Sequence, residues 1–321
     1  MIYSILKLWV RLAACIFCRK IIINNKEVLK QKGPLLLACN HPNSFLDSVI
    51  LDILFEQPLW SLARGDAFIN NKVSRFFKAV RIMPLYRTSE GVSNLSENYK
   101  TFNACLDIFN ENGLVHIYSE GKCINEWHLR PLKKGTARLV FKAWEENIPL
   151  KVIPVGINYS SFRRFGKNVF INFGEVITKE DIEWNGSDGT RNLSFNNHLR
   201  NQMEQLVFEI DKNDKARQSA LLEMKPSRFT KILLGVPAAA GFIMHAPLYL
   251  PVKNFALKKY SSTDHYDSVL TGILLFAYPL YVLLIVLLLF VFTKTAWIFL
   301  LFIVMPFTAW SYVQVKEQLD K

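Results

Sequence analysis

The hydrophobic positions in the first two thirds of the chain form short runs that alternate with longer amphipathic stretches. Apolar runs of strand length occupy residues 21–23, 35–39, 58–63, 113–118 and 150–157. Helical spacing with one apolar face is found at residues 44–55, 67–79, 95–110, 133–146 and 193–210. Strands that alternate with helices are typical of α/β domains. We therefore predict an α/β fold, a layered mixed sheet flanked by helices, in a domain over residues 21–211.

Two long apolar segments lie near the C-terminal end. Residues 269–292 contain no charged residue, and residues 295–313 are nearly as apolar. Each is long enough to cross a hydrocarbon core of about 30 Å, and only Thr293 and Lys294 separate them. The pattern predicts a transmembrane helical hairpin over residues 269–313.

A third apolar segment, residues 232–251, contains three prolines. If it crossed the bilayer, the lysines that follow it would lie outside, against the positive-inside tendency. These are Lys253, Lys258 and Lys259. We predict that this segment re-enters the membrane or lies in its interface. The basic stretch before it, residues 212–231, is expected to lie beside the membrane and attract anionic lipids, with a solvated linker as the open alternative.

The first 20 residues are apolar apart from a few basic positions. Lys7 and Arg11 lie four residues apart, on one helical face, and no acidic residue precedes Glu27. A signal peptide would carry its charge ahead of the apolar core and a small-residue cleavage site after it. We predict an amphipathic helix in the membrane interface. An ordinary helix packed on its own domain is the alternative.

The net charge indicates which partners the protein binds, and the cysteine spacing bears on metals and disulfides. The net charge of +12 points to an anionic partner, either a phosphorylated substrate or an anionic membrane surface. We expect no nucleic acid, because the sequence has no basic recognition helix or zinc-finger spacing. Cys15 and Cys18 form a lone C-x-x-C with no second pair, so we expect no metal and no disulfide framework. These features suit a domain that faces the cytoplasm.

The polar stretch Asn40-His41-Pro42-Asn43-Ser44-Phe45-Leu46-Asp47 follows one of the predicted strands. A histidine can accept a proton near neutral pH, and an aspartate can orient its ring. Six residues at about 100° each would separate the two side chains within one helix. We therefore place His41 in the turn before the helix and Asp47 in its first turns. A helix cap made by Asn40 or Asn43, with His41 incidental, is the alternative.

This stretch resembles the first motif of the PlsC-like glycerolipid acyltransferase family. The family usually has four residues between the histidine and the aspartate, and here there are five. Residues 152–156 resemble the fourth motif, and the resemblance extends over residues 33–177. It implies a glycerol-phosphate acyltransferase-like fold, with His41 and Asp47 as the catalytic base and its partner.

The resemblance also implies the residues that bind the substrate. Arg87 ends a segment similar to the second motif, whose arginine binds phosphate in the family. The stretch Ser119-Glu120-Gly121-Lys122 resembles the third motif, but here Ser119 and Lys122 stand where the family usually has proline and threonine. The resemblance implies that Glu120, Gly121 and Lys122 bind the glycerol-phosphate portion of the substrate. Arg64, at the end of an earlier strand, is a weaker phosphate contact.

The implied activity is transfer of a fatty acyl group in phospholipid synthesis, in the cell inner membrane. The donor would be acyl-CoA or acyl-carrier protein. The acceptor would be glycerol-3-phosphate, which the longer spacing favours, or 1-acylglycerol-3-phosphate (lysophosphatidate). No cofactor is implied, and direct attack by the acceptor hydroxyl is expected because Ser44 and Cys39 have no evident activator. The alternatives are another lysolipid or aminolipid acceptor, and a non-catalytic lipid-binding module.

Overall fold

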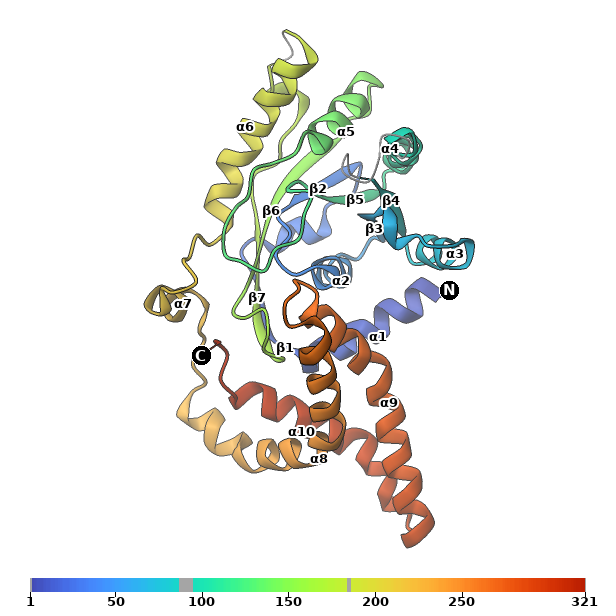
Figure 1. The fold of residues 1–321 in the computed structure, drawn as a ribbon, viewed down its shortest axis with the longest axis vertical. Coiled ribbons are helices and arrows are strands. Elements are labelled where there is room, and N and C mark those ends of the chain that lie inside the picture. The colour runs from blue at the N-terminus through green and yellow to red at the C-terminus, as the bar shows by residue number, and fades with distance from the viewer. Residues whose placement is uncertain (1, 87–94, 184–185, 321) are drawn as a thin grey trace.

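A computed structural model describes residues 2–86, 95–183 and 186–320. An α/β domain forms the upper part of the molecule in Figure 1, and long helices from the C-terminal third lie below it. The N-terminal helix lies where these two parts meet (Figure 1).

The centre of the domain is a seven-stranded sheet in the order β1-β7-β6-β2-β5-β3-β4. The strands are β1 Cys18–Ile23, β2 Leu35–Cys39, β3 Leu59–Arg64, β4 Ile82–Leu85, β5 Leu114–Tyr118, β6 Lys151–Tyr159 and β7 Lys167–Phe173. Neighbouring strands are parallel except for β6 and β7, which are antiparallel. The predicted mixed sheet is thereby confirmed.

Helices pack on both faces of this sheet. α2 Phe45–Leu54 lies on one face, and α7 Lys215–Leu222 adds Leu222 to the same core. α4 Leu95–Asn110, α5 Lys134–Glu145 and α6 Asp188–Leu206 lie on the other face. α3 Asn71–Ala79 has no buried residue. In β2, Leu35 and Leu37 pack into one core with α2, while Leu36 and Ala38 pack into the other with α5 and α6. A strand that is buried on both faces is apolar at every position, which explains the uninterrupted run at 35–39.

The helix α1, Ile2–Phe17, has an inner and an outer side. Val10, Ala14 and Phe17 are buried against the sheet domain. The two basic residues also face the protein: Lys7 pairs with Asp52 at 3.7 Å, and Arg11 Nε donates to the Ile53 carbonyl at 2.7 Å. Four large apolar side chains of the helix are exposed, Ile2, Ile5, Leu8 and Leu12. The helix therefore packs on its own domain and presents an apolar strip outward.

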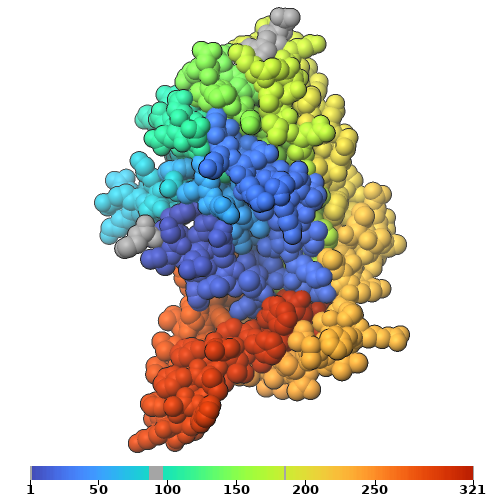
Figure 2. Space-filling view, turned by 180° about the vertical axis from the view of Figure 1, so that it is seen from behind, coloured from blue at the N-terminus to red at the C-terminus, as the bar shows by residue number. Residues whose placement is uncertain are grey.

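Three helices at the C-terminal end are long and apolar enough to cross a membrane. They are α8 Arg228–Tyr260, α9 Tyr266–Thr293 and the segment that ends in α10 Leu301–Val315. Many apolar side chains on them are exposed: Ile232, Val236, Ile243, Leu280, Phe292 and Ile303. Seen from behind, α9 and α10 project from the base of the molecule (Figure 2). Such unpaired apolar surface indicates membrane association.

The predicted re-entrant segment, residues 232–251, lies inside α8, which runs as one helix of 33 residues through Pro237, Pro247 and Pro251. α8 packs closely against α10 at Gly241, where an added Cβ would lie 2.1 Å from the Thr308 carbonyl oxygen. The placement of α8 relative to a bilayer stays a prediction.

Candidate active site

The turn after β2 brings His41 and Asp47 together. His41 lies between β2 and α2, and Asp47 lies in the first turn of α2. His41 Nδ1 is 2.8 Å from Asp47 Oδ2. Between the two residues, Ser44 has φ 50° and ψ −136°. Positive φ is uncommon outside glycine, and such strained residues concentrate at functional sites.

Asp47 is fully buried, and three donors satisfy its carboxylate. Oδ2 faces His41 Nδ1 and also accepts from the backbone N–H of Asn43 at 2.9 Å. Oδ1 accepts from the hydroxyl of Tyr159 at 2.7 Å. Burial raises the pKa of Tyr159 well above its ordinary value, so this hydroxyl remains a donor. A buried charge is tolerated when it is hydrogen-bonded in this way.

The imidazole of His41 is held on one face by Tyr118 at the end of β5. The two ring centroids are 3.7 Å apart at an interplanar angle of 12°, and the Tyr118 hydroxyl is 2.7 Å from Ser48 Oγ. The His41 side chain is 16% exposed, which leaves an opening to solvent. Because Nδ1 faces Asp47, Nε2 is the ring nitrogen that can meet a substrate.

Glu120 supports the backbone beside His41. Its Oε2 accepts from the His41 N–H at 2.9 Å and its Oε1 from the Arg130 N–H at 2.8 Å. The side chain is buried, and this burial raises the pKa of Glu120 to about 7. The next residue, Gly121, has φ +67°, a conformation that favours glycine. Both residues thus fix the loop that follows β5.

Two of the three predicted cationic residues, Lys122 and Arg64, lie on the surface. Lys122 is exposed, and the exposed guanidinium of Arg64 forms an ion pair with Asp66. Burial lowers the pKa of the neighbouring His265, the charge of Asp264 opposes this, and Arg64 also lowers that pKa. Arg87 lies outside the described residues.

Sequence reasoning missed the contribution of the segment between α8 and α9. Ser44 Oγ lies 2.7 Å from His265 Nδ1. Asp264 Oδ1 accepts from the Asn125 N–H at 2.9 Å, and Asn125 Nδ2 donates to the Pro42 carbonyl at 2.7 Å. This C-terminal segment therefore contacts the turn that carries His41. Tyr118 and Tyr159 were also missed, because a tyrosine at the end of an apolar strand gives no separate signal.

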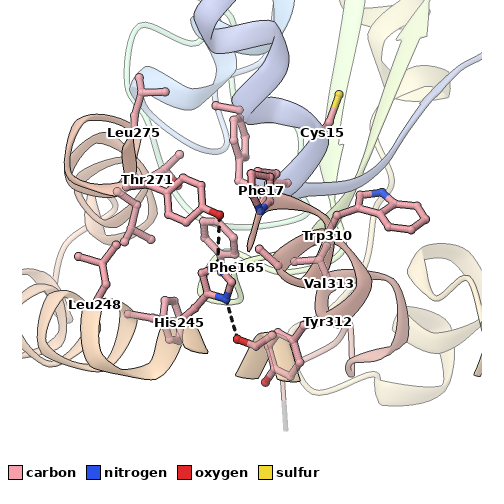
Figure 3. Close-up of a pocket in the computed structure, with 18 of the residues that line it drawn as sticks. Cys15, Phe17, Phe165, His245, Leu248, Thr271, Leu275, Trp310, Tyr312 and Val313 are labelled. Carbon is pink, nitrogen blue, oxygen red and sulfur yellow. Dashed lines mark hydrogen bonds between the residues drawn. The ribbon is translucent and has the colours of Figure 1, made fainter. Parts of the chain in front are cut away.

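A cavity of about 520 Å³ lies among α1, α8, α9 and α10 (Figure 3). Its lining is almost wholly apolar, with Phe17, Phe165, Leu248 and Leu275 among the residues that enclose it. Polar contacts among its lining residues include those of His245, whose Nε2 is 3.2 Å from the Tyr278 hydroxyl and whose Nδ1 is 2.7 Å from the Gly241 carbonyl oxygen. His41, Asp47 and Glu120 are not part of its lining, so it is separate from the site described above.

Both the sequence and the fold of this chain resemble known acyltransferases. The family model described as "Acyltransferase" matches residues 20–158, the stretch that contains His41, Asp47 and Glu120. A search of curated proteins finds no match. Among solved structures, the chain is similar to the 1-acyl-sn-glycerophosphate (LPA) acyltransferase PlsC from Thermotoga maritima. That similarity has 12% identity and a TM-score of 0.45, and covers 63% of this chain and 78% of that one. Residues 20–158, somewhat less than half of the chain, are thus similar to the acyltransferase family of enzymes.

Proposed function

We propose that this protein transfers a fatty acyl group from a thioester donor to a hydroxyl of a glycerol-phosphate acceptor at a membrane. The observation that carries the proposal is the contact between His41 Nδ1 and Asp47 Oδ2 at 2.8 Å, in a partly exposed turn. Such a pair within an acyltransferase-like domain has the chemistry that acyl transfer needs, because the acceptor hydroxyl must lose a proton as it attacks.

In the proposed reaction, His41 Nδ1–H donates to Asp47, so Nε2 carries the lone pair. Nε2 takes the proton of the acceptor hydroxyl as the hydroxyl oxygen bonds to the thioester carbonyl carbon. Asp47 stabilises the imidazolium that forms. When the tetrahedral intermediate collapses, the C–S bond breaks and Nε2 returns the proton to the departing thiolate. The ring of Tyr118 keeps the imidazole in one plane throughout.

We favour direct transfer over a covalent acyl-enzyme. Burial raises the pKa of the Cys39 and Cys123 thiols well above the usual value, so neither forms the thiolate that acts as a nucleophile. Ser44 does contact a histidine, His265. A serine nucleophile needs its base oriented by a third group, and among the described residues no carboxylate bonds the His265 ring.

For the acceptor we propose glycerol-3-phosphate or 1-acylglycerol-3-phosphate, on the resemblance of the motifs. Arg64 and Lys122 are exposed cations that could pair with a phosphate, and Arg87 is proposed for the same role. The donor would be acyl-CoA or acyl-carrier protein.

The setting would be the inner membrane, with the α/β domain in the cytoplasm. α9 and α10 supply the predicted hairpin, and the apolar strip of α1 would rest in the interface. The basic residues 212–231 would lie near anionic lipid headgroups. This placement would keep the enzyme beside the membrane that holds a lysophosphatidate acceptor or a lipid product.

The test is an assay of purified protein in lipid nanodiscs with labelled acyl-CoA, and separately with labelled acyl-carrier protein. Glycerol-3-phosphate and lysophosphatidate are offered in parallel. His41→Ala should lower the rate about 10²–10⁴-fold, whereas His128→Ala should leave it unchanged, because His128 is exposed and its ring pairs with Glu209 rather than with Asp47. Transfer to a lysolipid or aminolipid that lacks the phosphomonoester would favour the other acceptor class. An unchanged rate in His41→Ala would refute the proposed base.

A further inference from the structure

The start of α9 contacts the active-site turn through two consecutive residues. Asp267 Oδ2 accepts from the side-chain amide of Asn43 at 2.7 Å. Ser268 Oγ accepts from the Leu46 N–H at 3.3 Å and donates to the Asn43 carbonyl at 3.2 Å. These bonds hold the turn at Asn43 and Leu46, on either side of the strained Ser44. A helix proposed to cross the membrane is thus in direct contact with the catalytic turn.

Asp267 is the only charged residue of α9, which the structure describes throughout. Its side chain is 1% exposed and forms an ion pair with Lys167, the first residue of β7, whose side chain is 2% exposed. A buried carboxylate is costly unless it is paired and hydrogen-bonded, and Asp267 Oδ2 has both kinds of partner. Lys167 therefore neutralises the charge of Asp267 within the protein.

Two chains of contacts connect Asp267 to the carboxylate of Asp47. The Lys167 ammonium lies over the ring of Tyr159, 5.8 Å from its centroid, and Tyr159 donates to Asp47. On the other side, Asp267 holds the Asn43 side chain while the Asn43 N–H donates to Asp47. The backbone of Asn43 is therefore fixed from two directions, by Asp267 through its side chain and by Asp47 through its N–H.

Stability alone does not explain this ion pair. Apolar residues of similar volume often replace a buried pair without loss, because the desolvation of two charges offsets their attraction. What an apolar pair could not supply is an acceptor for the Asn43 amide. The arrangement thus provides a specific hydrogen bond to Asn43, whose N–H donates to Asp47.

We propose that Asp267 is a positioning residue for acyl transfer, and that the C-terminal hairpin is a structural part of the active site as well as an anchor. Through Asn43, Asp267 sets the position of the turn that holds His41 against Asp47. This inference rests on the proposed function of that pair.

The test compares two double variants that both remove the buried charges. Lys167→Met with Asp267→Asn keeps an oxygen that can accept from Asn43. Lys167→Met with Asp267→Leu has a similar volume and no acceptor. We expect the Leu variant to lose about 100-fold in kcat, the effect of a small displacement in a catalytic group, with the KM values for both substrates unchanged. The Asn variant should retain most of the wild-type kcat.

Flotation with liposomes should be alike in the two double variants, because both lack the ion pair. The Leu variant should unfold at a lower temperature, because the buried Asn43 amide loses its acceptor, so kcat is compared well below both unfolding midpoints. Equal kcat in the two, whether high or low, would overturn the inference, because the hydrogen bond to Asn43 would then make no difference. His41→Ala tests the proposed function separately. If that variant turns over at the wild-type rate, His41 and Asp47 are not the catalytic pair.

Discussion

His41 Nδ1 lies 2.8 Å from Asp47 Oδ2 although five residues separate the two positions. Between the two, Ser44 adopts φ 50° directly before α2 begins. His41 lies in the turn and Asp47 in the helix. The angular separation that 3.6 residues per turn would impose within one helix therefore does not apply to this pair. The longer spacing is therefore compatible with the contact.

Asp47→Asn tests the electrostatic part of this contact. An amide has one acceptor oxygen, so it cannot serve His41, Asn43 and Tyr159 as the carboxylate does. It also lacks the charge that stabilises an imidazolium. We expect a loss of about 10³–10⁴-fold in kcat, as for the equivalent change in a serine-protease triad. Steady-state kinetics with both acceptors would measure it, and a loss of less than tenfold would show that Asp47 does not support the base.

Much of the fold follows from the sequence, because strands buried on both faces need uninterrupted apolar runs. The run at 35–39 gives β2, and its polar continuation gives the turn with His41. The contacts of Asp267 and Lys167 could not be predicted from the sequence, because 100 residues separate the two positions. The lone acidic residue at the start of an apolar helix is the signal that could have pointed to Asp267. Its partner becomes visible only when β7 is placed beside it.

Tyr159→Phe tests the third donor to Asp47. The change removes the hydroxyl that bonds Oδ1 at 2.7 Å and preserves the ring. A hydrogen bond to a charged group contributes about 1.5–3 kcal/mol, so we expect a lower unfolding midpoint and a lower kcat. Tyr118→Phe is the matched control, because its hydroxyl bonds Ser48 rather than Asp47 while its ring still stacks on His41. If the two variants lose the same activity, the bond to Asp47 has no special role.

His116 gives the folded domain a dependence on pH. It is buried in β5 with Nε2 2.6 Å from Ser61 Oγ, and burial lowers its pKa from 6.5 to about 3. As the pH falls below about 6.5, the unfolded chain takes up a proton that the folded chain refuses. Stability should therefore fall by up to about 1.4 kcal/mol per pH unit until the pH nears 3.

The unfolding midpoint of the protein in detergent, measured from pH 7 to pH 5, would show this slope. His116→Leu cannot titrate, and it leaves the Ser61 hydroxyl unpaired, so it should lower the midpoint at every pH and reduce the slope. A slope that is as steep in His116→Leu as in the wild type would assign the acid sensitivity to other groups.

Ser44→Ala distinguishes direct transfer from a covalent route. The hydroxyl of Ser44 is 2.7 Å from His265 Nδ1, so a serine and a histidine do meet beside the active-site turn. Alanine keeps the Cβ and the same backbone cost at positive φ, and it removes only the oxygen. If His41 activates the acceptor hydroxyl directly, kcat should change little, because the Ser44 hydroxyl takes no part in bond formation. Loss of activity in this variant, together with an acyl adduct on Ser44 of the wild type in mass spectra, would instead establish an acyl-serine intermediate.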